Sequence, residues 1–589
     1  MKQFFKFMFA SMLGFLLTWV IVFVVFIGII VSALSFGKDK KVTIEPNSIL
    51  EITLNTPIQE RAGSNPFENF DFGNMKSNQA LGLDQILKSI KEAENDVNIQ
   101  GIFLNLSDVQ CAPATLEAIR NGLIDFKKSK KFVISYSENY SQKAYYLATV
   151  ANKIYLNKEG SIDLKGLSLQ VMFYKGFLEK LDIEPQIIRH GKFKAAVEPF
   201  ILDKMSEANR EQLMTYLSST WNHMVKGISE ARKIDISIIQ KAADELTLQN
   251  PEENITLKFI DGLVYKDELL TELKKLVKVS TDKDLSLVSL STYSKVAKSK
   301  AESVRTKDKI AVIYATGEIV DGEGNDKSIG GESLSKEIRA ARLDDNIKAV
   351  VLRVNSPGGS ALASEVIWRE VSLTKAKKPV VISMGDYAAS GGYYIACAAS
   401  AIVAEPTTLT GSIGVFGFIP SIKNLLNKKL GITVDVVKTN AHADYMNIYR
   451  PLDTYEYATI QKSIERIYAT FIKRVGDGRK MDVARVDSMG QGRIWSGLDA
   501  KRLGLVDEIG GLQLAIDIAA KKANVSKYRV VYRPIQKEFF QQLLESSKTA
   551  ESSIIERELG ESYMFVDYIR SLKNMKGVQA RVPFVIDIY

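Results

Sequence analysis

Histidine and cysteine are scarce in this chain of 589 residues. The three histidines are His190, His223 and His442, and the two cysteines are Cys111 and Cys397. No two histidines have the spacing of metal ligands, and no CxxC motif or Cys/His cluster occurs, so we expect no metal site and no other cofactor. Two cysteines also argue against a disulfide framework. The shortage of histidine disfavours a Ser-His-Asp triad and makes lysine the leading candidate for the base of a nucleophilic serine.

The features of a nucleic-acid-binding protein are also missing. The net charge of +9 arises from 78 basic and 69 acidic residues spread along the chain, without an arginine-rich stripe interleaved with aromatic residues. We therefore expect no nucleic-acid partner.

The length of the chain exceeds what one hydrophobic core usually supports, which predicts two or more domains.

Only one long apolar run is present. No charged residue lies between Lys6 and Gly37, and residues 7–34 are mostly Phe, Leu, Val, Ile and Met. This exceeds the roughly 20 apolar residues that span a bilayer. Residues 31–33 loosely fit a signal-peptide cleavage site, but the apolar core is longer than that of most signal peptides, so an uncleaved anchor in the lipid bilayer is favoured. Lysines on both sides leave its orientation open.

The rest of the chain contains an internal repeat. Residues 98–106 (NIQGIFLNL) recur as residues 346–354 (NIKAVVLRV), an offset of 346 − 98 = 248. Further matches at this offset are Tyr145 with Tyr393, Tyr146 with Tyr394, and Gly166 with Gly414. The pattern predicts two tandem α/β units. We expect an anchor over residues 1–45, the two copies over 46–300 and 301–530, and a tail over 531–589.

Ser390 stands where a predicted strand passes into a predicted helix. The apolar runs at 349–354 and 379–383 read as buried strands, and residues 393–400 are small and apolar, as in a helix packed closely on a sheet. Ser390 would lie on a tight turn, where the following N–H groups at a helix N-terminus can stabilise an oxyanion. An N-capping serine followed by glycines is the alternative.

A second glycine pair follows the preceding strand. Residues 355–359 read Asn-Ser-Pro-Gly-Gly, and the glycines allow backbone N–H groups to approach a reacting carbonyl. The order strand–SPGG–helix–strand–ASGG–helix resembles the fold shared by the proteolytic subunit of Clp protease and the crotonases, in which two such turns face one another.

The two copies differ at the positions where chemistry is expected. Ser390 corresponds to Gln142, whereas Lys194, with a shift of one residue, corresponds to Ala443. One copy therefore keeps a serine and the other keeps a lysine, as expected if each supplies half of one active site. Independent surface drift is the alternative.

Several longer motifs are similar to those of the long-form signal peptide peptidase A family, which are membrane-bound serine peptidases with tandem repeats of the ClpP/crotonase fold. They are GKFKAAVEPF (191–200), NSPGG (355–359), DYAASGGYY (386–394), TGSIGV (410–415) and GRIWSGLDAKRLGLVDEIGG (492–511). The resemblance implies that Ser390 is the nucleophile and Lys194 the general base, with Lys192 as a nearby competitor. Burial beside apolar neighbours would lower the pKa of such a lysine and make it a base. The N–H groups of Gly391 and of Gly358 or Gly359 would then hold the oxyanion.

By the same resemblance, the chain is a single-span endopeptidase that degrades cleaved signal peptides through an acyl-enzyme. The resemblance implies a homotetramer whose catalytic part lies on the outer side of the bacterial inner membrane. Three other readings remain: a protease for misfolded membrane or envelope proteins, a crotonase-like enzyme acting on acyl-thioesters, and a non-catalytic peptide-binding scaffold.

Overall fold

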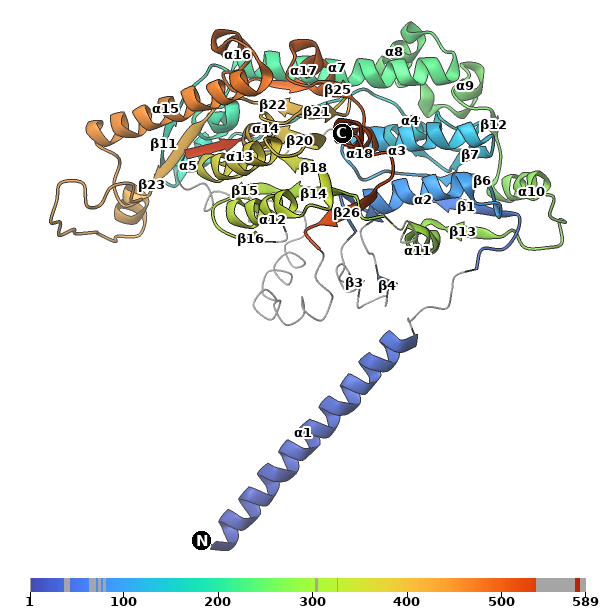
Figure 1. The fold of residues 1–589 in the computed structure, drawn as a ribbon, viewed down its shortest axis with the longest axis horizontal. Coiled ribbons are helices and arrows are strands. Elements are labelled where there is room, and N and C mark those ends of the chain that lie inside the picture. Colours follow the sequence, from blue (N-terminus) through green and yellow to red (C-terminus); the bar gives the residue numbers. More distant parts are fainter. Residues whose placement is uncertain are drawn as a thin grey trace.

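The computed structural model describes residues 2–36, 43–62, 70–71, 76–77, 81–301, 306–325, 327–535 and 578–582. A long helix, α1 (Lys2–Phe36), stands apart from an α/β body (Figure 1). Most of the expected tail, residues 536–577 and 583–589, lies outside the described residues.

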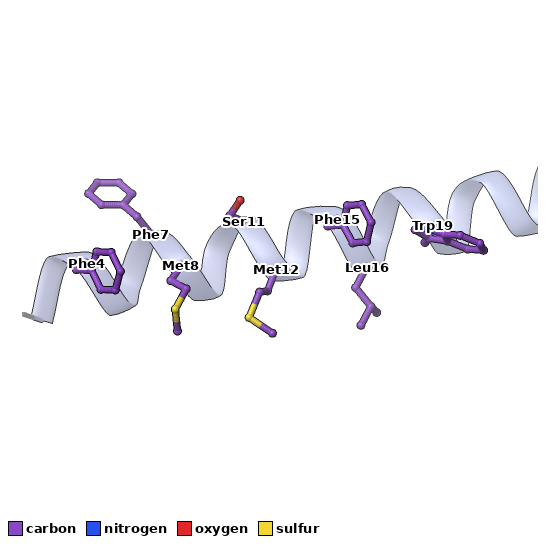
Figure 2. Close-up of a pocket in the computed structure, with 8 residues that line it drawn as sticks. All are labelled: Phe4, Phe7, Met8, Ser11, Met12, Phe15, Leu16 and Trp19. Carbon is purple, nitrogen blue, oxygen red and sulfur yellow. The ribbon is translucent and has the colours of Figure 1, made fainter.

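Helix α1 is the one helix among the described residues that is long and apolar enough to cross a membrane. Its segment Lys6–Val25 has a mean hydropathy of 2.4, and none of it is buried against the body. Figure 2 shows the apolar side chains that project from its first turns: Phe4, Phe7, Met8, Met12, Phe15, Leu16 and Trp19, with Ser11 among them. The helix is consistent with the expected membrane anchor.

The first copy of the repeat is built on a six-stranded sheet that is parallel throughout. Its order is β12 (Gly262–Leu263), β9 (Lys153–Leu156), β7 (Phe132–Ser137), β6 (Ile99–Asn105), β1 (Ser48–Ile52) and β13 (Leu287–Ser289). The central strands are nearly continuous apolar runs because both faces are covered. Helices α2 (Leu83–Asn95) and α3 (Pro113–Phe126) cover one face, and α10 (Lys266–Leu276) covers the other.

The second copy repeats this strand order. Its parallel strands are β25 (Glu508–Ile509), β21 (Ala401–Ala404), β20 (Val380–Ala389), β18 (Ile347–Ser356), β14 (Lys309–Thr316) and β26 (Arg529–Arg533). Strands β22 (Leu409–Gly411) and β24 (Ile494–Ser496) extend the sheet beside the end of β20. Helices α12 (Gly331–Leu343), α13 (Ala361–Lys375) and α18 (Leu512–Lys522) cover it. The predicted tandem α/β repeat is therefore confirmed.

A third sheet joins the two copies. Its order is β11 (Glu184–Arg189), β23 (Phe416–Ser421), β27 (Val578–Arg581), β19 (Gly358–Ser360), β15 (Glu318–Val320), β17 (Ser328–Gly330) and β16 (Gly324–Asn325). β11 and α5 (Lys175–Lys180) come from the first copy, but β11 pairs antiparallel with β23 of the second (Figure 1). This pairing carries the chain that follows β11 into the second copy.

The remaining helices and strands complete the two copies. They are β2 (Ile58–Gln59), β3 (Phe70–Asp71), β4 (Lys76–Ser77), β5 (Leu81–Gly82), β8 (Tyr140–Ser141), α4 (Gln142–Ala148), β10 (Ile162–Asp163), α6 (Glu198–Ile201), α7 (Glu207–Arg232), α8 (Ile236–Asp244), α9 (Pro251–Thr256), α11 (Leu290–Ala301), α14 (Gly391–Ala396), α15 (Thr454–Arg479), α16 (Val483–Met489) and α17 (Gly497–Leu503).

A buried polar network also links the two copies. Its members in the second copy lie on strands β18 and β20, and β20 ends just before Ser390. Arg353 on β18 donates two hydrogen bonds of 2.9 Å to the carboxylate of Glu60, which belongs to the first copy. Asn355 donates to the same carboxylate at 3.1 Å. Asp386 on β20 accepts hydrogen bonds from the backbone N–H and the hydroxyl of Thr115, at the start of α3. These contacts fix β18 and β20 against the first copy.

We predict that Glu60→Ala lowers the free energy of unfolding by about 3–5 kcal/mol, because it leaves the buried Arg353 guanidinium without its carboxylate. Asp125→Ala is the matched control, since it breaks an exposed ion pair with Lys128 and should cost at most about 1 kcal/mol. Urea unfolding followed by circular dichroism measures both. Equal effects of the two substitutions would contradict the role given to the network.

Candidate active site

Ser390 occupies a strained turn between β20 and α14. Its backbone has φ 53° and ψ −113°, a region that costs a non-glycine residue on the order of 1–3 kcal/mol. The backbone N–H of Ser390 donates to the Gly411 carbonyl at 2.8 Å, which holds the turn in place. The side chain is fully buried, and its hydroxyl donates to the Gly414 carbonyl at 3.3 Å.

Lys194 reaches Ser390 from the first copy. It follows β11 and precedes the short turn Ala195–Val197, and it is fully buried. Its Nζ donates to Ser390 Oγ at 2.9 Å and to Ser412 Oγ at 3.1 Å. The two residues that the sequence places in different copies therefore lie in hydrogen-bond contact.

The polar neighbours of the Lys194 amine are all uncharged. No carboxylate pairs with its ammonium group among the described residues, and the Phe416 ring centroid lies 6.0 Å from Nζ. Burial therefore lowers the pKa of Lys194 well below its usual value. Lys192, the competing lysine, is exposed, and its Nζ lies over the Phe193 ring at 5.3 Å.

Close backbone packing fixes the position of Lys194. A side chain on Gly492 would lie 2.6 Å from the backbone of Lys194, and one on Gly414 would lie 3.3 Å from its Cδ. The Phe193 N–H donates to the Gln491 carbonyl at 3.0 Å. The motifs at 410–415 and 492–511 thus form the walls around the lysine.

Ser412 is a site residue that sequence reasoning did not single out. It lies in the TGSIGV motif, has φ 47°, and its side chain and carbonyl both contact Lys194 Nζ. Its only sequence signal is its position in that motif. The Lys194 amine therefore lies in hydrogen-bond contact with two serine hydroxyls.

The predicted glycines lie together beside Ser390. Gly358 and Gly359 have φ values of 101° and 155°, which favour glycine. A side chain on Gly358 would lie 2.7 Å from the Gly391 nitrogen, and one on Gly391 would lie 3.1 Å from the Gly359 nitrogen. The two glycine turns therefore face one another. The Gly358 N–H also donates to Ser356 Oγ at 3.2 Å.

Strand β27 lies across these turns, between β19 and β23. The Ala580 carbonyl oxygen is so close that a side chain on Gly358 would lie 2.1 Å from it and one on Gly391 would lie 3.0 Å from it. The Val582 N–H donates to the Pro357 carbonyl at 2.8 Å, and the Val582 side chain packs among apolar residues of α7. A described segment of the chain thus runs as an extended strand past the serine.

In the first copy, Gln142 occupies the position that corresponds to Ser390. The Gln142 side chain donates to the Gly166 carbonyl at 3.1 Å and accepts from the N–H groups of Lys165 and Gly166, both at 3.0 Å. Gly166 is the counterpart of Gly414, which contacts Ser390 in the second copy. The side-chain amide of Gln142 therefore forms hydrogen bonds with the backbone groups of Lys165 and Gly166.

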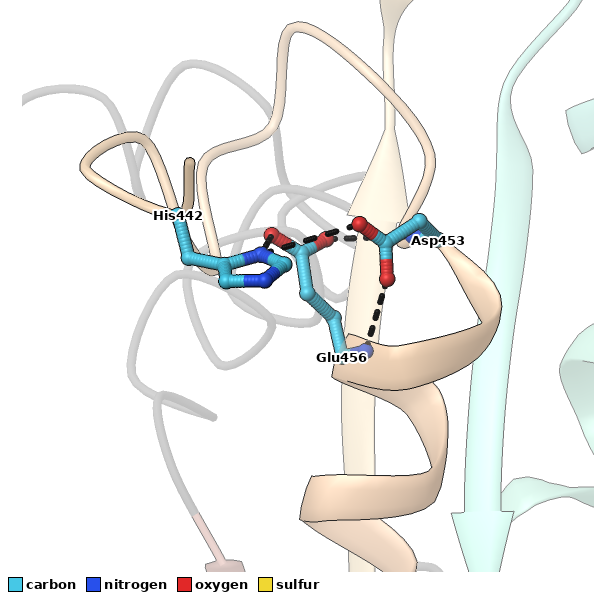
Figure 3. Close-up of side chains that lie close together, drawn as sticks. All are labelled: His442, Asp453 and Glu456. Carbon is cyan, nitrogen blue, oxygen red and sulfur yellow. Dashed lines mark hydrogen bonds and ion pairs between the residues drawn. The ribbon is translucent and has the colours of Figure 1, made fainter. Parts of the chain in front are cut away.

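The three histidines have partners elsewhere. His190 stacks on Tyr468 with ring centroids 4.0 Å apart, and His223 Nε2 lies 3.3 Å from a Glu117 oxygen. His442 Nδ1 lies 3.1 Å from Glu456 Oε1, with Asp453 beside them (Figure 3).

Hydrogen bonds within the protein explain why His442, Asp453 and Glu456 lie close together in Figure 3. Asp453 caps α15 by accepting the Glu456 N–H at 2.8 Å, and Glu456 accepts the Asp453 N–H at 3.0 Å. Arg450 donates to both oxygens of Glu456, at 2.7 and 2.6 Å. These bonds account for the closeness of the three side chains without an ion.

Comparison with known proteins identifies the family of this chain. A sequence profile of peptidase family S49 matches residues 125–280 and 372–526, more than half of the chain. Protease 4 of Salmonella typhi is 39% identical over 464 residues, which are 77% of this chain and 74% of that protein. The chloroplastic serine protease SPPA of Arabidopsis thaliana is 34% identical over 559 residues, 92% of this chain and 78% of that protein.

A mutant of the membrane-bound stomatin-specific protease 1510-N is a similar solved structure, with 17% identity and a TM-score of 0.25 over 39% of this chain and 99% of that one. The two profile matches fall one in each half of the chain, as the internal repeat predicts. The chain therefore belongs to peptidase family S49, and the prediction of a serine protease is confirmed.

Proposed function

We propose that this protease is a membrane-anchored endopeptidase with Ser390 as nucleophile and Lys194 as general base. The observation that carries the proposal is the 2.9 Å distance between Lys194 Nζ and Ser390 Oγ in a fully buried setting where the polar partners of the amine are uncharged. A lysine of ordinary pKa is an ammonium at neutral pH and cannot accept a proton. The lowered pKa of Lys194 supplies the neutral amine that the reaction needs.

In the proposed reaction, Lys194 Nζ accepts the hydroxyl proton as Ser390 Oγ attacks the carbonyl carbon of a peptide bond. The Lys194 ammonium then gives that proton to the departing amine, which leaves an ester on Ser390. A water molecule, deprotonated by the same amine, hydrolyses the ester and frees the acid product. Ser412 holds the amine in place through both half-reactions.

The N–H groups of Gly391 and Gly359 are proposed to hold the oxyanion of the tetrahedral intermediate. The Ala580 carbonyl oxygen lies beside the same turns, which supports the view that a substrate carbonyl binds there. The Gly358 N–H is engaged by Ser356, so Gly358 serves by allowing close backbone approach. Loss of an oxyanion donor of this kind costs about 10²–10³-fold in turnover.

The substrates of this protease are peptides, and we propose that they bind as β27 does, in an extended conformation between β19 and β23. The apolar surroundings of Val582 favour apolar side chains on the substrate. Together with the anchor helix, this supports cleaved signal peptides in the membrane as the substrates.

The family resemblance supports the remaining proposals. They are a homotetramer, α1 as an anchor in the bacterial inner membrane, and a catalytic part on its outer side. The proposed division is an anchor over residues 1–45, copies over 46–300 and 301–530, and a tail over 531–589.

We predict that a serine-reactive phosphonate labels the detergent-solubilised wild type and not Ser390→Ala. Lys194→Ala should label about 10²–10⁴-fold more slowly, because the general base is lost. Lys192→Ala is the matched control and should label like the wild type, since its side chain is exposed. Intact-mass spectrometry reads the adduct. Equal labelling of Lys194→Ala and wild type would contradict the assignment of Lys194 as the base.

The pH profile of labelling should report the Lys194 amine. Because burial lowers its pKa, the neutral form is present above that lowered pKa and is lost as the pH falls through it. The labelling rate should therefore be already maximal below pH 10, where an unburied lysine would still be protonated. Lys194→Arg should be inactive across this range. A wild-type rate that keeps rising up to the ordinary lysine pKa would contradict the account.

Removal of residues 578–589 should lower KM for a peptide substrate and leave kcat unchanged, because β27 no longer competes for the groove. If β27 occupies the groove nine-tenths of the time, the decrease is about tenfold. A truncation after Val582, which keeps β27, is the control. An unchanged KM in the longer truncation, with phosphonate labelling intact, would show that substrates do not use this groove.

A further inference from the structure

The side-chain amide of Gln212, on helix α7 of the first copy, lies between the segment that carries Lys194 and the sheet that carries Ser390. Its Nε2 donates to the Phe193 carbonyl oxygen at 3.0 Å, which fixes the peptide group just before Lys194. Its Oε1 accepts the N–H of Ile494, on β24 of the second copy, at 3.2 Å. Gln212 is only 1% exposed. A single buried amide therefore ties the two copies together beside the proposed catalytic pair.

Strand β24 connects this amide to the turn of the nucleophile. Ile494 pairs with Gly411 across β24 and β22. The Gly411 carbonyl in turn accepts the backbone N–H of Ser390 at 2.8 Å. The amide of Gln212 therefore fixes the segment before the lysine relative to the strands that hold the turn of Ser390.

Two further buried side chains fix the direction in which this amide points. Asn209, one turn earlier on α7, accepts a second hydrogen bond from Gln212 Nε2 at 3.0 Å. Asn209 Nδ2 donates to a carboxylate oxygen of Glu198 at 3.0 Å. The same carboxylate accepts the hydroxyl of Ser206 at 2.5 Å and its backbone N–H at 3.2 Å, at the N-terminus of α7. Asn209 and Glu198 are each 1% exposed.

These hydrogen bonds allow one consistent assignment of donors and acceptors. An ionised carboxylate only accepts, so Asn209 must turn its amino group toward Glu198 and its oxygen toward Gln212. Gln212 must then present Nε2 to Asn209. Its Oε1 is left to accept from Ile494. Buried networks whose members are all satisfied hold a single arrangement, so the carboxylate of Glu198 determines how Gln212 meets both copies.

The second copy lacks this chain of amides at the matching helix. Helices α7 and α15 both have 26 residues, and their first residues differ by 454 − 207 = 247. At this offset Gln212 corresponds to Thr459, which is exposed, and Asn209 corresponds to Glu456. Of these two helices, only α7 carries the buried amides, and it belongs to the copy that supplies Lys194.

We propose that Gln212 is a positioning residue for Lys194, and that Glu198 and Asn209 act on the lysine through it. The amide holds the backbone before Lys194 at a fixed place relative to Ser390, so that Nζ stays within hydrogen-bond reach of Oγ. Because the last member of the chain is an amide, it holds this segment without adding a charged partner for the amine. The inference rests on the proposed roles of Ser390 and Lys194.

The rate of phosphonate labelling tests this role in the detergent-solubilised full-length protein. Gln212→Met keeps the length of the side chain and removes its amide. We expect the limiting rate constant of labelling to fall about 10²-fold, because a misplacement of about 1 Å costs this much. The reagent concentration that gives half of the limiting rate should stay unchanged, since the amide of Gln212 is enclosed by protein.

The matched control is Asn254→Leu. Asn254 is a buried amide of the first copy on α9, where it donates to the carbonyls of Leu248 and Asn250. Its loss should lower the urea midpoint of unfolding, as Gln212→Met does, and leave labelling at the wild-type rate. A labelling rate that falls equally in both variants would show that lost stability, and not the position of the lysine, causes the effect, and would overturn the proposal.

A double variant tests whether Glu198 acts through Gln212. Glu198→Gln replaces one acceptor with a donor that faces Asn209, so it should also slow labelling. If both residues act along one path, the variant that combines Glu198→Gln with Gln212→Met should label no more slowly than Gln212→Met alone. A decrease equal to the product of the two single decreases would overturn the part assigned to Glu198. Glu198→Gln is also the smaller change, and it provides the test if Gln212→Met does not fold.

Failure of this inference and failure of the proposed function are distinguishable. Wild-type labelling of Gln212→Met, with Lys194→Ala still slow, would overturn the positioning role and leave the serine–lysine pair in place. Wild-type labelling of Lys194→Ala would instead remove the role of the lysine on which the inference rests.

Discussion

The contact between a buried lysine and a buried serine is the interaction on which the rest of this structure depends. Enclosing an ammonium group without a charged partner is unfavourable, so burial lowers the pKa of the Lys194 amine. Lys194 has hydroxyl and carbonyl oxygens as neighbours and an aromatic ring nearby. A carboxylate at this place would stabilise the ammonium and remove the base. The absence of a charged partner is therefore what the proposed role of Lys194 as a base requires.

The two residues come from different copies of the repeat. Ser390 stands at the end of a central strand of the second copy, on a turn whose backbone is strained. Lys194 arrives from the first copy, because β11 leaves its own copy and pairs with β23. The buried pair of Glu60 with Arg353 and the cap of Asp386 on α3 hold the same two copies together near the serine. The proposed site therefore takes its serine from one copy and its lysine from the other.

Local patterns in the sequence were sufficient to predict much of this site. The strand runs, the glycine pairs and the repeat predict two α/β copies and place Ser390 on a turn. The complementary loss of serine and lysine predicts a site shared by the copies. Spacing alone cannot separate Lys194 from Lys192, since the choice depends on which side chain is buried, and burial depends on the approach of Gly492 from far along the chain.

Other features depend on contacts between distant segments and have no local signal. Ser412 meets Lys194 only because β22 ends beside β20. Ala580 reaches the glycine turns through a strand near the end of the chain. The pairing of β11 with β23 joins strands that lie in different copies, far apart in the chain. Prediction of such pairings requires the three-dimensional arrangement of both copies.

Lys194 and Ser390 of the same chain are proposed to form one active site, and mixed oligomers test this assignment most directly. Ser390→Ala and Lys194→Ala chains with different affinity tags are coexpressed, purified through both tags and treated with the phosphonate. The account predicts that the Lys194→Ala subunit, which keeps its serine, stays as slow to label as it is alone. Labelling of that subunit at close to the wild-type rate would mean that the lysine comes from a neighbouring chain, and would contradict the account.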